Sequence, residues 1–264
     1  MAAGIPKEKA AEYVEMYAEM LTNGESIDEL TYRRIVKELE NLHTSNAISA
    51  LGLLHALAGN ETLSIQLFEA ALATNDYSLA INFIFMLRET SNYLAMHEKV
   101  FDLADRFGTK ELTVVAYSTA FRFGDREKLD YYFDKHIKLL SDEERREEAM
   151  KHKNELITEL DEALSNSGCT KDQLVLLAKI IWKIVKEYGA HAGFVELNRN
   201  NHSAYIVDVK NKDPKTIAKM NYSLAEAICS DEALDGCELV ARFSSPRQLH
   251  TGVSYSYAAN NTSK

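Results

Sequence analysis

A repeated pattern of small, aromatic and turn-forming residues is the feature that most constrains how this chain can fold. Its best copy spans residues 49–76 and has a Gly59-Asn60 turn near its middle. Phe68 of this copy recurs 33 residues later as Phe101, and Phe133 follows after another 32. One helix–turn–helix unit of this kind cannot bury its apolar face alone, so the pattern predicts a stack of helical hairpins. Such stacks mostly build binding surfaces, which favours interaction over catalysis.

Helical periodicity runs through residues 9–188 and divides the first part of the chain into four hairpins. The second helix of the first hairpin is expected at 27–42, with Ser26 as its N-cap and Glu29 completing a capping box. Gly52 is expected to let a neighbouring helix approach closely, because it carries no Cβ. The third hairpin has no glycine at its turn. The expected hairpins cover residues 9–42, 49–76, 77–109 and 110–140.

The order of residues within the best copy resembles the tetratricopeptide repeat family, and the resemblance covers residues 9–140. It implies an α-solenoid whose concave groove binds extended peptides through the first helix of each hairpin. The usual tryptophan and the proline that often closes each unit are absent, so a merely tetratricopeptide-like α-solenoid fits equally well. An irregular helical bundle is the further alternative. The residues that carry the resemblance are Leu51, Gly52, His55, Gly59, Asn60, Ser64, Phe68 and Ala71.

The pattern changes after residue 168, where Asn166-Ser167-Gly168 ends a highly charged helix. Alternating Val, Ile and Tyr residues then predict strands, and Asp213-Pro214 predicts the start of a helix. We therefore expect a mainly α protein in which a tetratricopeptide-like helical-hairpin solenoid precedes a small α+β domain of order α-β-β-α-β. The expected domains are a repeat domain with a capping helix at 9–167, the α+β domain at 168–244 and a flexible tail at 245–264.

The resemblance also implies which residues would face a partner. Carried over by position in the repeat, they form a mixed apolar and amide surface. This surface lacks the lysines and paired asparagines with which some family members clamp a carboxylate tail. The sequence thus favours a non-enzymatic adaptor or regulatory protein that binds a protein or peptide. The implied groove residues are Asn46, Ser49, Leu53, Asn82, Met86, Glu89, Val114, Ser118 and Arg122.

A different function is suggested by Glu196, Asp208 and Lys210. Asp208 and Lys210 share one face of an expected strand, and Glu196 lies on the strand before it. Two carboxylates and a lysine can hold a divalent metal ion, and the local pattern is similar to the PD-(D/E)xK nuclease core. No Pro-Asp pair precedes the acid, however. The alternatives are a metal-dependent nuclease effector or a solvated charged face on a hairpin.

Composition and net charge limit which partners and which cellular compartment are expected. The net charge of −10 over 264 residues argues against a nucleic-acid partner, except under the nuclease alternative. The three cysteines show no CxxC spacing, which favours reduced thiols and a cytoplasmic protein. No signal peptide or membrane-spanning segment is expected, and neither is a metal or a cofactor. A protein or peptide is the expected partner, and a homo-oligomer is compatible with the sequence.

Overall fold

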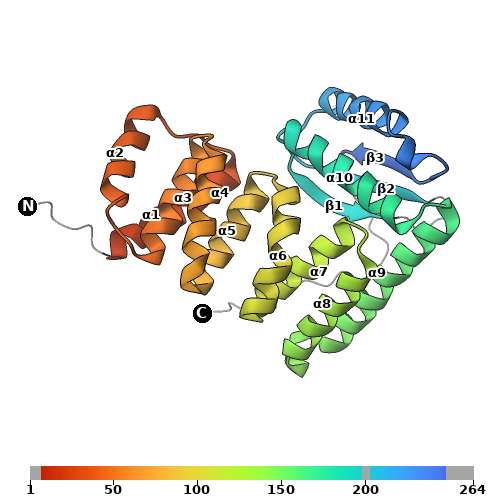
Figure 1. Ribbon diagram of the computed structural model, residues 1–264, viewed down its shortest axis with the longest axis horizontal. Helices are drawn as coiled ribbons and strands as arrows, with labels where there is room; N and C mark the ends of the chain where they lie inside the picture. The colour runs from red at the N-terminus through yellow and green to blue at the C-terminus, as the bar shows by residue number, and fades with distance from the viewer. Residues whose placement is uncertain (1–6, 198–202, 248–264) are drawn as a thin grey trace, which may run out of the picture. The chain divides into compact units, whose positions relative to one another are not determined.

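The computed structural model describes residues 7–197 and 203–247, and it divides into two compact units, residues 1–96 and 97–264. Helices make up most of the described chain, and a small three-stranded sheet lies near its C-terminus (Figure 1). The prediction of a mainly α fold is thus confirmed, as is the α-β-β-α-β order after residue 168. Among the described helices, none has both the length and the apolar character that crossing a bilayer requires.

The first unit is built around one apolar helix, α3. This helix contacts α1, α4 and α5, and its residues Ala50, Leu53 and Leu54 are completely buried. The expected turn at Gly59-Asn60 separates α3 from α4. The helices of this unit are α1 (Lys7–Asn23), α2 (Glu29–Leu39), α3 (Ser45–Leu57), α4 (Glu61–Ala71) and α5 (Tyr77–Glu89).

Of two local details of this unit, the first differs from expectation and the second agrees with it. The N-cap of α2 is Asp28 and not Ser26, and its carboxylate accepts a hydrogen bond from the Thr31 backbone N–H at 3.0 Å. A carboxylate also suits the positive end of the helix dipole, which explains the choice. The turn after α5 has no glycine, and Ser91 takes the left-handed conformation there with φ 57°.

Gly52 allows close packing between α3 and α4, as expected. A Cβ at this position would lie 2.3 Å from Cε2 of Phe68, which is completely buried. Ser64 of α4 also donates a hydrogen bond to the Gly52 carbonyl at 2.7 Å. The two helices are therefore fixed against each other by the Phe68 ring, which needs a glycine opposite it, and by the Ser64 hydroxyl.

We expect Gly52→Ala to lower the free energy of unfolding by about 1–3 kcal/mol, because the added methyl group must displace the Phe68 ring. Urea denaturation measures the change. The matched control is Gly59→Asn, since Gly59 has φ 76° and open space around it, and asparagine tolerates that conformation. Equal losses in both variants would contradict the packing argument.

The second unit combines helical hairpins with the sheet. The hairpin α7–α8 packs on the long charged helix α9, and α10 and α11 contact each other. Helix α6 (Tyr93–Phe107) begins just before this unit. The remaining elements are α7 (Lys110–Arg122), α8 (Arg126–Leu139), α9 (Arg146–Ser167), α10 (Lys171–Glu187), β1 (Ala192–Glu196), β2 (Ala204–Val209), α11 (Pro214–Cys229) and β3 (Val240–Ser244).

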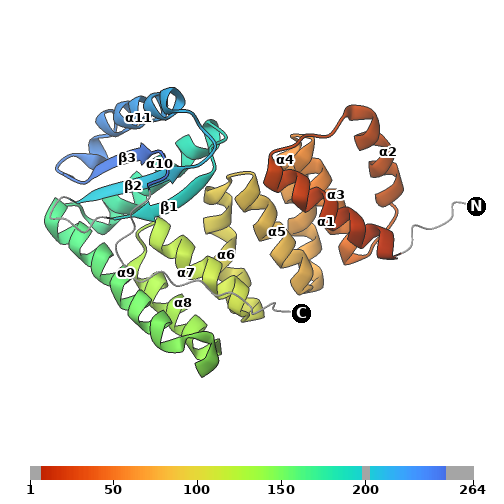
Figure 2. The ribbon, with the colours of Figure 1, turned by 180° about the vertical axis from the view of Figure 1, so that it is seen from behind.

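The sheet has the order β1-β2-β3. Strand β1 is antiparallel to β2, with Val195 opposite Val207, whereas β2 and β3 are parallel and connected through α11. Seen from behind, α11 lies beside β3 (Figure 2). Asn221 of α11 accepts from the Phe243 N–H at 2.7 Å and donates to its carbonyl at 3.0 Å. This side chain therefore covers part of the β3 edge.

The second unit contains a buried histidine with a lowered pKa. His136 is completely buried, and its Nδ1 lies 3.1 Å from the Thr113 hydroxyl. Burial lowers the pKa of His136 to about 4. The charge of Lys110 lowers this pKa further, while Glu144 and a hydrogen bond with the Lys110 backbone act in the opposite direction. The imidazole is therefore neutral in the folded protein near pH 7.

We expect the protein to lose stability as the pH falls from about 6.5 to about 4, because the unfolded chain binds a proton at His136 that the folded chain excludes. The loss attributable to His136 is about 1 kcal/mol per pH unit in this window. Urea denaturation at pH 7 and pH 5 measures it. His136→Gln should reduce the pH dependence, whereas the exposed His43→Gln should not. An unchanged slope in His136→Gln would contradict the assignment.

Candidate functional site

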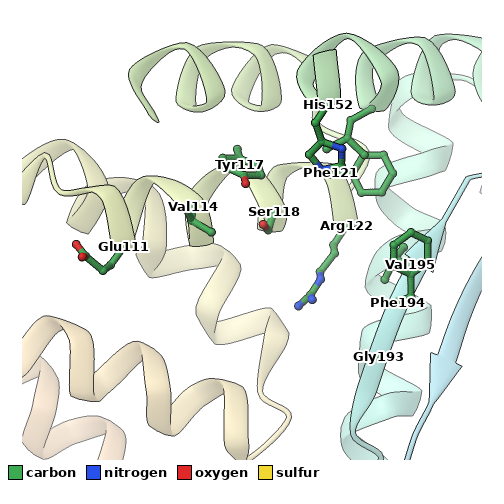
Figure 3. Close-up of a pocket in the computed structure, with 11 residues that line it drawn as sticks. Glu111, Val114, Tyr117, Ser118, Phe121, Arg122, His152, Gly193, Phe194 and Val195 are labelled. Atoms are coloured by element: carbon green, nitrogen blue, oxygen red, sulfur yellow. The ribbon is translucent and has the colours of Figure 1, made fainter. Parts of the chain in front are cut away.

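The second unit contains a pocket of about 510 Å³ between α7, α9 and β1 (Figure 3). Its wall is largely apolar, with a few polar groups placed among aromatic and aliphatic side chains. This composition is typical of sites that bind an apolar side chain or a small molecule. The lining residues are Glu111, Val114, Tyr117, Ser118, Phe121, Arg122, His152, Leu156, Gly193, Phe194 and Val195.

One helix face supplies the largest part of the wall. Val114, Ser118 and Arg122 follow one another at intervals of four residues, so they share one face of α7, and all three line the pocket (Figure 3). These are the three residues that the repeat pattern assigned to the groove in the fourth hairpin. The structure thus brings this part of the predicted set together in one concave site.

Strand β1 forms the opposite wall. Phe194 is apolar yet 47% exposed, and it lies in the pocket wall between Gly193 and Val195. Beyond the strand, the Leu197 backbone N–H donates to the carboxylate of Glu159 on α9 at 2.5 Å. This bond connects α9 to the end of β1. The sequence predicted the charged helix and the short β-prone segment, but it did not indicate that either would line a site; the one available signal was an apolar residue in that segment.

The C-terminal end of α7 is tied to the sheet and to α10 through one carbonyl group. The Arg122 carbonyl accepts hydrogen bonds from Trp182 Nε1 at 3.2 Å and from the Tyr205 hydroxyl. Both donors belong to completely buried side chains. Burial also raises the pKa of Tyr205, so the hydroxyl keeps its proton and acts as a donor. This arrangement holds α7 opposite β1 and thereby defines the pocket.

The predicted groove residues of the first unit do not line this pocket. Asn82 donates a hydrogen bond to the Ser49 hydroxyl at 2.9 Å, which joins α5 to α3. Glu89 is paired with Arg88 at 2.8 Å, and Asn46 is exposed. A partner could not touch the buried members without separating helices, so their observed role is packing. The buried members are Ser49, Leu53 and Met86.

The two carboxylates of the nuclease hypothesis lie close together, around an arginine. Arg247 donates from Nη1 to Glu196 at 2.5 Å and from Nε to Asp208 at 2.8 Å. Burial alone would lower the pKa of Arg247, but the bonds and charges of the two carboxylates outweigh it and raise the pKa. Asp208 is only 3% exposed, whereas Lys210 is exposed.

This cluster has the form of a structural ion pair. The guanidinium lies where a cation shared by Glu196 and Asp208 would lie, and it neutralises a carboxylate that is almost fully buried. Within residues 7–197 and 203–247, no group of three or more His, Cys, Asp or Glu side chains could hold a metal ion. The geometry therefore favours a structural role for these acids over metal-dependent cleavage.

Comparison with known proteins assigns no family to the chain. No family model matches it, and no match was found among curated proteins or solved structures. Its function must therefore be inferred from the chemistry of the pocket and of the residues around it.

We expect Tyr205→Phe to lower the free energy of unfolding by about 1 kcal/mol, because the variant loses one buried hydrogen bond to the Arg122 carbonyl. Denaturation in urea, followed by circular dichroism, measures the loss. Tyr222→Phe is the control, since Tyr222 is 73% exposed and its hydroxyl has water available. If both variants were as stable as the wild type, the bond would not be what ties α7 to β2.

Proposed function

We propose that this chain is a non-enzymatic, cytoplasmic interaction protein that captures an extended segment of a protein partner in the pocket between α7, α9 and β1. The proposal rests on the exposure and the position of Phe194. This large apolar side chain is 47% exposed, and it lies in the wall of a pocket that Val114, Ser118 and Arg122 also line. An exposed aromatic group inside a concave, mostly apolar wall is the usual anchor of a protein interface.

The size of the pocket supports a short segment over a folded domain. A volume of about 510 Å³ is in the range of pockets that take a small ligand or a few side chains. Val114, Phe121 and Leu156 add apolar wall around Phe194. An aliphatic or aromatic side chain of the partner would be removed from water on several sides, which is the main source of affinity at such sites.

The position of β1 in the sheet supports an extended partner. Strand β1 is at the edge of the order β1-β2-β3, so only β2 pairs with it among the described strands. An edge strand offers backbone groups to an added strand, and side-chain pockets beside it then provide specificity. Residues 193–195 belong to both β1 and the pocket wall. One bound segment would therefore meet backbone groups and apolar side chains at the same place.

The charges at the two ends of the α7 wall suggest the order of charges in the partner. Glu111 and Arg122 both line the pocket (Figure 3), and their separation along α7 corresponds to about 16 Å of helix. An extended chain covers this length in about five residues. We infer a segment of that length, with an apolar centre, a basic residue toward Glu111 and an acidic residue toward Arg122.

We expect Phe194→Asp to weaken partner binding at least about 30-fold, because a charge at an apolar anchor costs 2 kcal/mol or more. Partners captured by the full-length wild-type protein would be identified by mass spectrometry, and their affinities measured by calorimetry. Tyr222→Asp is the matched control, since Tyr222 is exposed on α11 and does not line the pocket. Circular dichroism checks that both variants are folded.

Partners that bind Phe194→Asp as tightly as the wild type would refute the pocket as the binding site. Equal losses in Phe194→Asp and Tyr222→Asp would also contradict the proposal, because the effect would then not depend on the pocket. If the captured partner is a second copy of this chain, sedimentation of the purified wild type and of Phe194→Asp will show an oligomer that only the wild type forms.

A further inference from the structure

Two backbone segments of the second unit meet at the end of α9, and each of them carries a cysteine. One is the turn between α9 and α10, with Ser167 and Cys169, and the other is the loop before β3, with Cys237 and Glu238. The Glu238 backbone N–H donates to the Ser167 carbonyl at 2.9 Å. A Cβ on Gly168 would lie only 3.6 Å from the Gly236 carbonyl oxygen. The two segments are thus in direct backbone contact around the cysteines.

Cys237 is one of the groups that influence the pKa of the Cys169 thiol. Cys169 is 5% exposed and Cys237 is half-buried, and both are reduced. Burial, together with a hydrogen bond to the Cys237 thiol and the charge of its thiolate, raises the pKa of Cys169 to about 12. The Cys169 thiol also donates to the Thr170 carbonyl, with an Sγ–O distance of 3.6 Å. The Cys169 backbone N–H also donates to the Ser167 hydroxyl at 3.3 Å, which restrains the turn.

We propose that Cys169 and Cys237 are an oxidation site, at which a peroxide converts the two thiols into a reversible disulfide. A disulfide requires Cα atoms about 4.4–6.8 Å apart, and the backbone contacts of Ser167 with Glu238 and of Gly168 with Gly236 bring the two cysteine-bearing segments side by side. The third cysteine, Cys229, is exposed on α11 and is not part of the pair.

The reaction takes two steps. Cys237, the more accessible thiol, attacks one oxygen of hydrogen peroxide, the O–O bond breaks, and a sulfenic acid and one water molecule form. The Cys169 sulfur then attacks the sulfenic sulfur, its proton leaves with the hydroxyl group as a second water molecule, and the S–S bond forms. The two thiols lose two electrons and the peroxide gains them. A reducing dithiol reverses the change.

The disulfide would close a loop of about 70 residues, and loop closure of this kind restricts the unfolded chain. That loop contains α10, β1, β2 and α11. Because β1 forms one wall of the pocket, oxidation would make the sheet side of the pocket harder to unfold. The inference about the disulfide itself holds whether or not the pocket binds a partner.

The experiment uses the full-length protein treated with hydrogen peroxide and digested without reductant. We expect mass spectrometry to find a Cys169–Cys237 linked peptide, and the intact protein to lose the mass of two hydrogens. Cys169→Ser and Cys237→Ser should each abolish the link, whereas Cys229→Ser should leave it unchanged. In Cys169→Ser, dimedone should trap a sulfenic acid at Cys237.

The pH dependence of the rate of disulfide formation is a second measurement. Because only the thiolate of Cys169 attacks, its high pKa makes this step slow at neutral pH, and closure of the disulfide should accelerate about tenfold per pH unit between pH 7 and pH 9. Links that involve Cys229, links only between two copies of the chain, or no link after prolonged exposure to peroxide at pH 9 would each overturn the proposal.

Discussion

The pocket of this protein depends on the Arg122 carbonyl at the end of α7. The last carbonyl groups of a helix have no partner within the helix, and burying one of them without a hydrogen bond is costly. Here Trp182 of α10 and Tyr205 of β2 both donate to it. The same bonds that satisfy the helix end therefore tie α7 to the sheet and place the β1 wall opposite the α7 wall.

Strands β1 and β2 contain buried residues, the acids of an ion pair and part of the pocket wall. Val195 lies opposite Val207, and both are buried, although the pairing of β1 with β2 is irregular between Ala192 and Val195. Glu196 is held by Arg247, together with the buried Asp208. Phe194 lies in the pocket wall. The acidic pair thus supports the sheet, and the aromatic residue forms part of the pocket wall.

Sequence patterns with a local physical cause were reliable in this chain. The glycine and aromatic positions of the best repeat predicted the α3–α4 hairpin and the close approach of a neighbouring helix at Gly52, because both follow from residue size and helical spacing. Patterns with several equivalent local solutions were less reliable. Asp28 caps α2 where Ser26 was expected. That the hairpins stack as a tetratricopeptide-like solenoid stays a prediction.

The sequence by itself determined where the helices and strands lie, their order and the face of α7 that carries Val114, Ser118 and Arg122, since periodicity and turn residues act over a few positions. Only the tertiary structure decided that this face lies opposite Phe194, that Arg247 binds Glu196 and Asp208, and that the segments carrying Cys169 and Cys237 lie side by side. These contacts join residues far apart in the chain. Their geometry depends on how buried side chains pack and satisfy their hydrogen bonds, which no local pattern specifies.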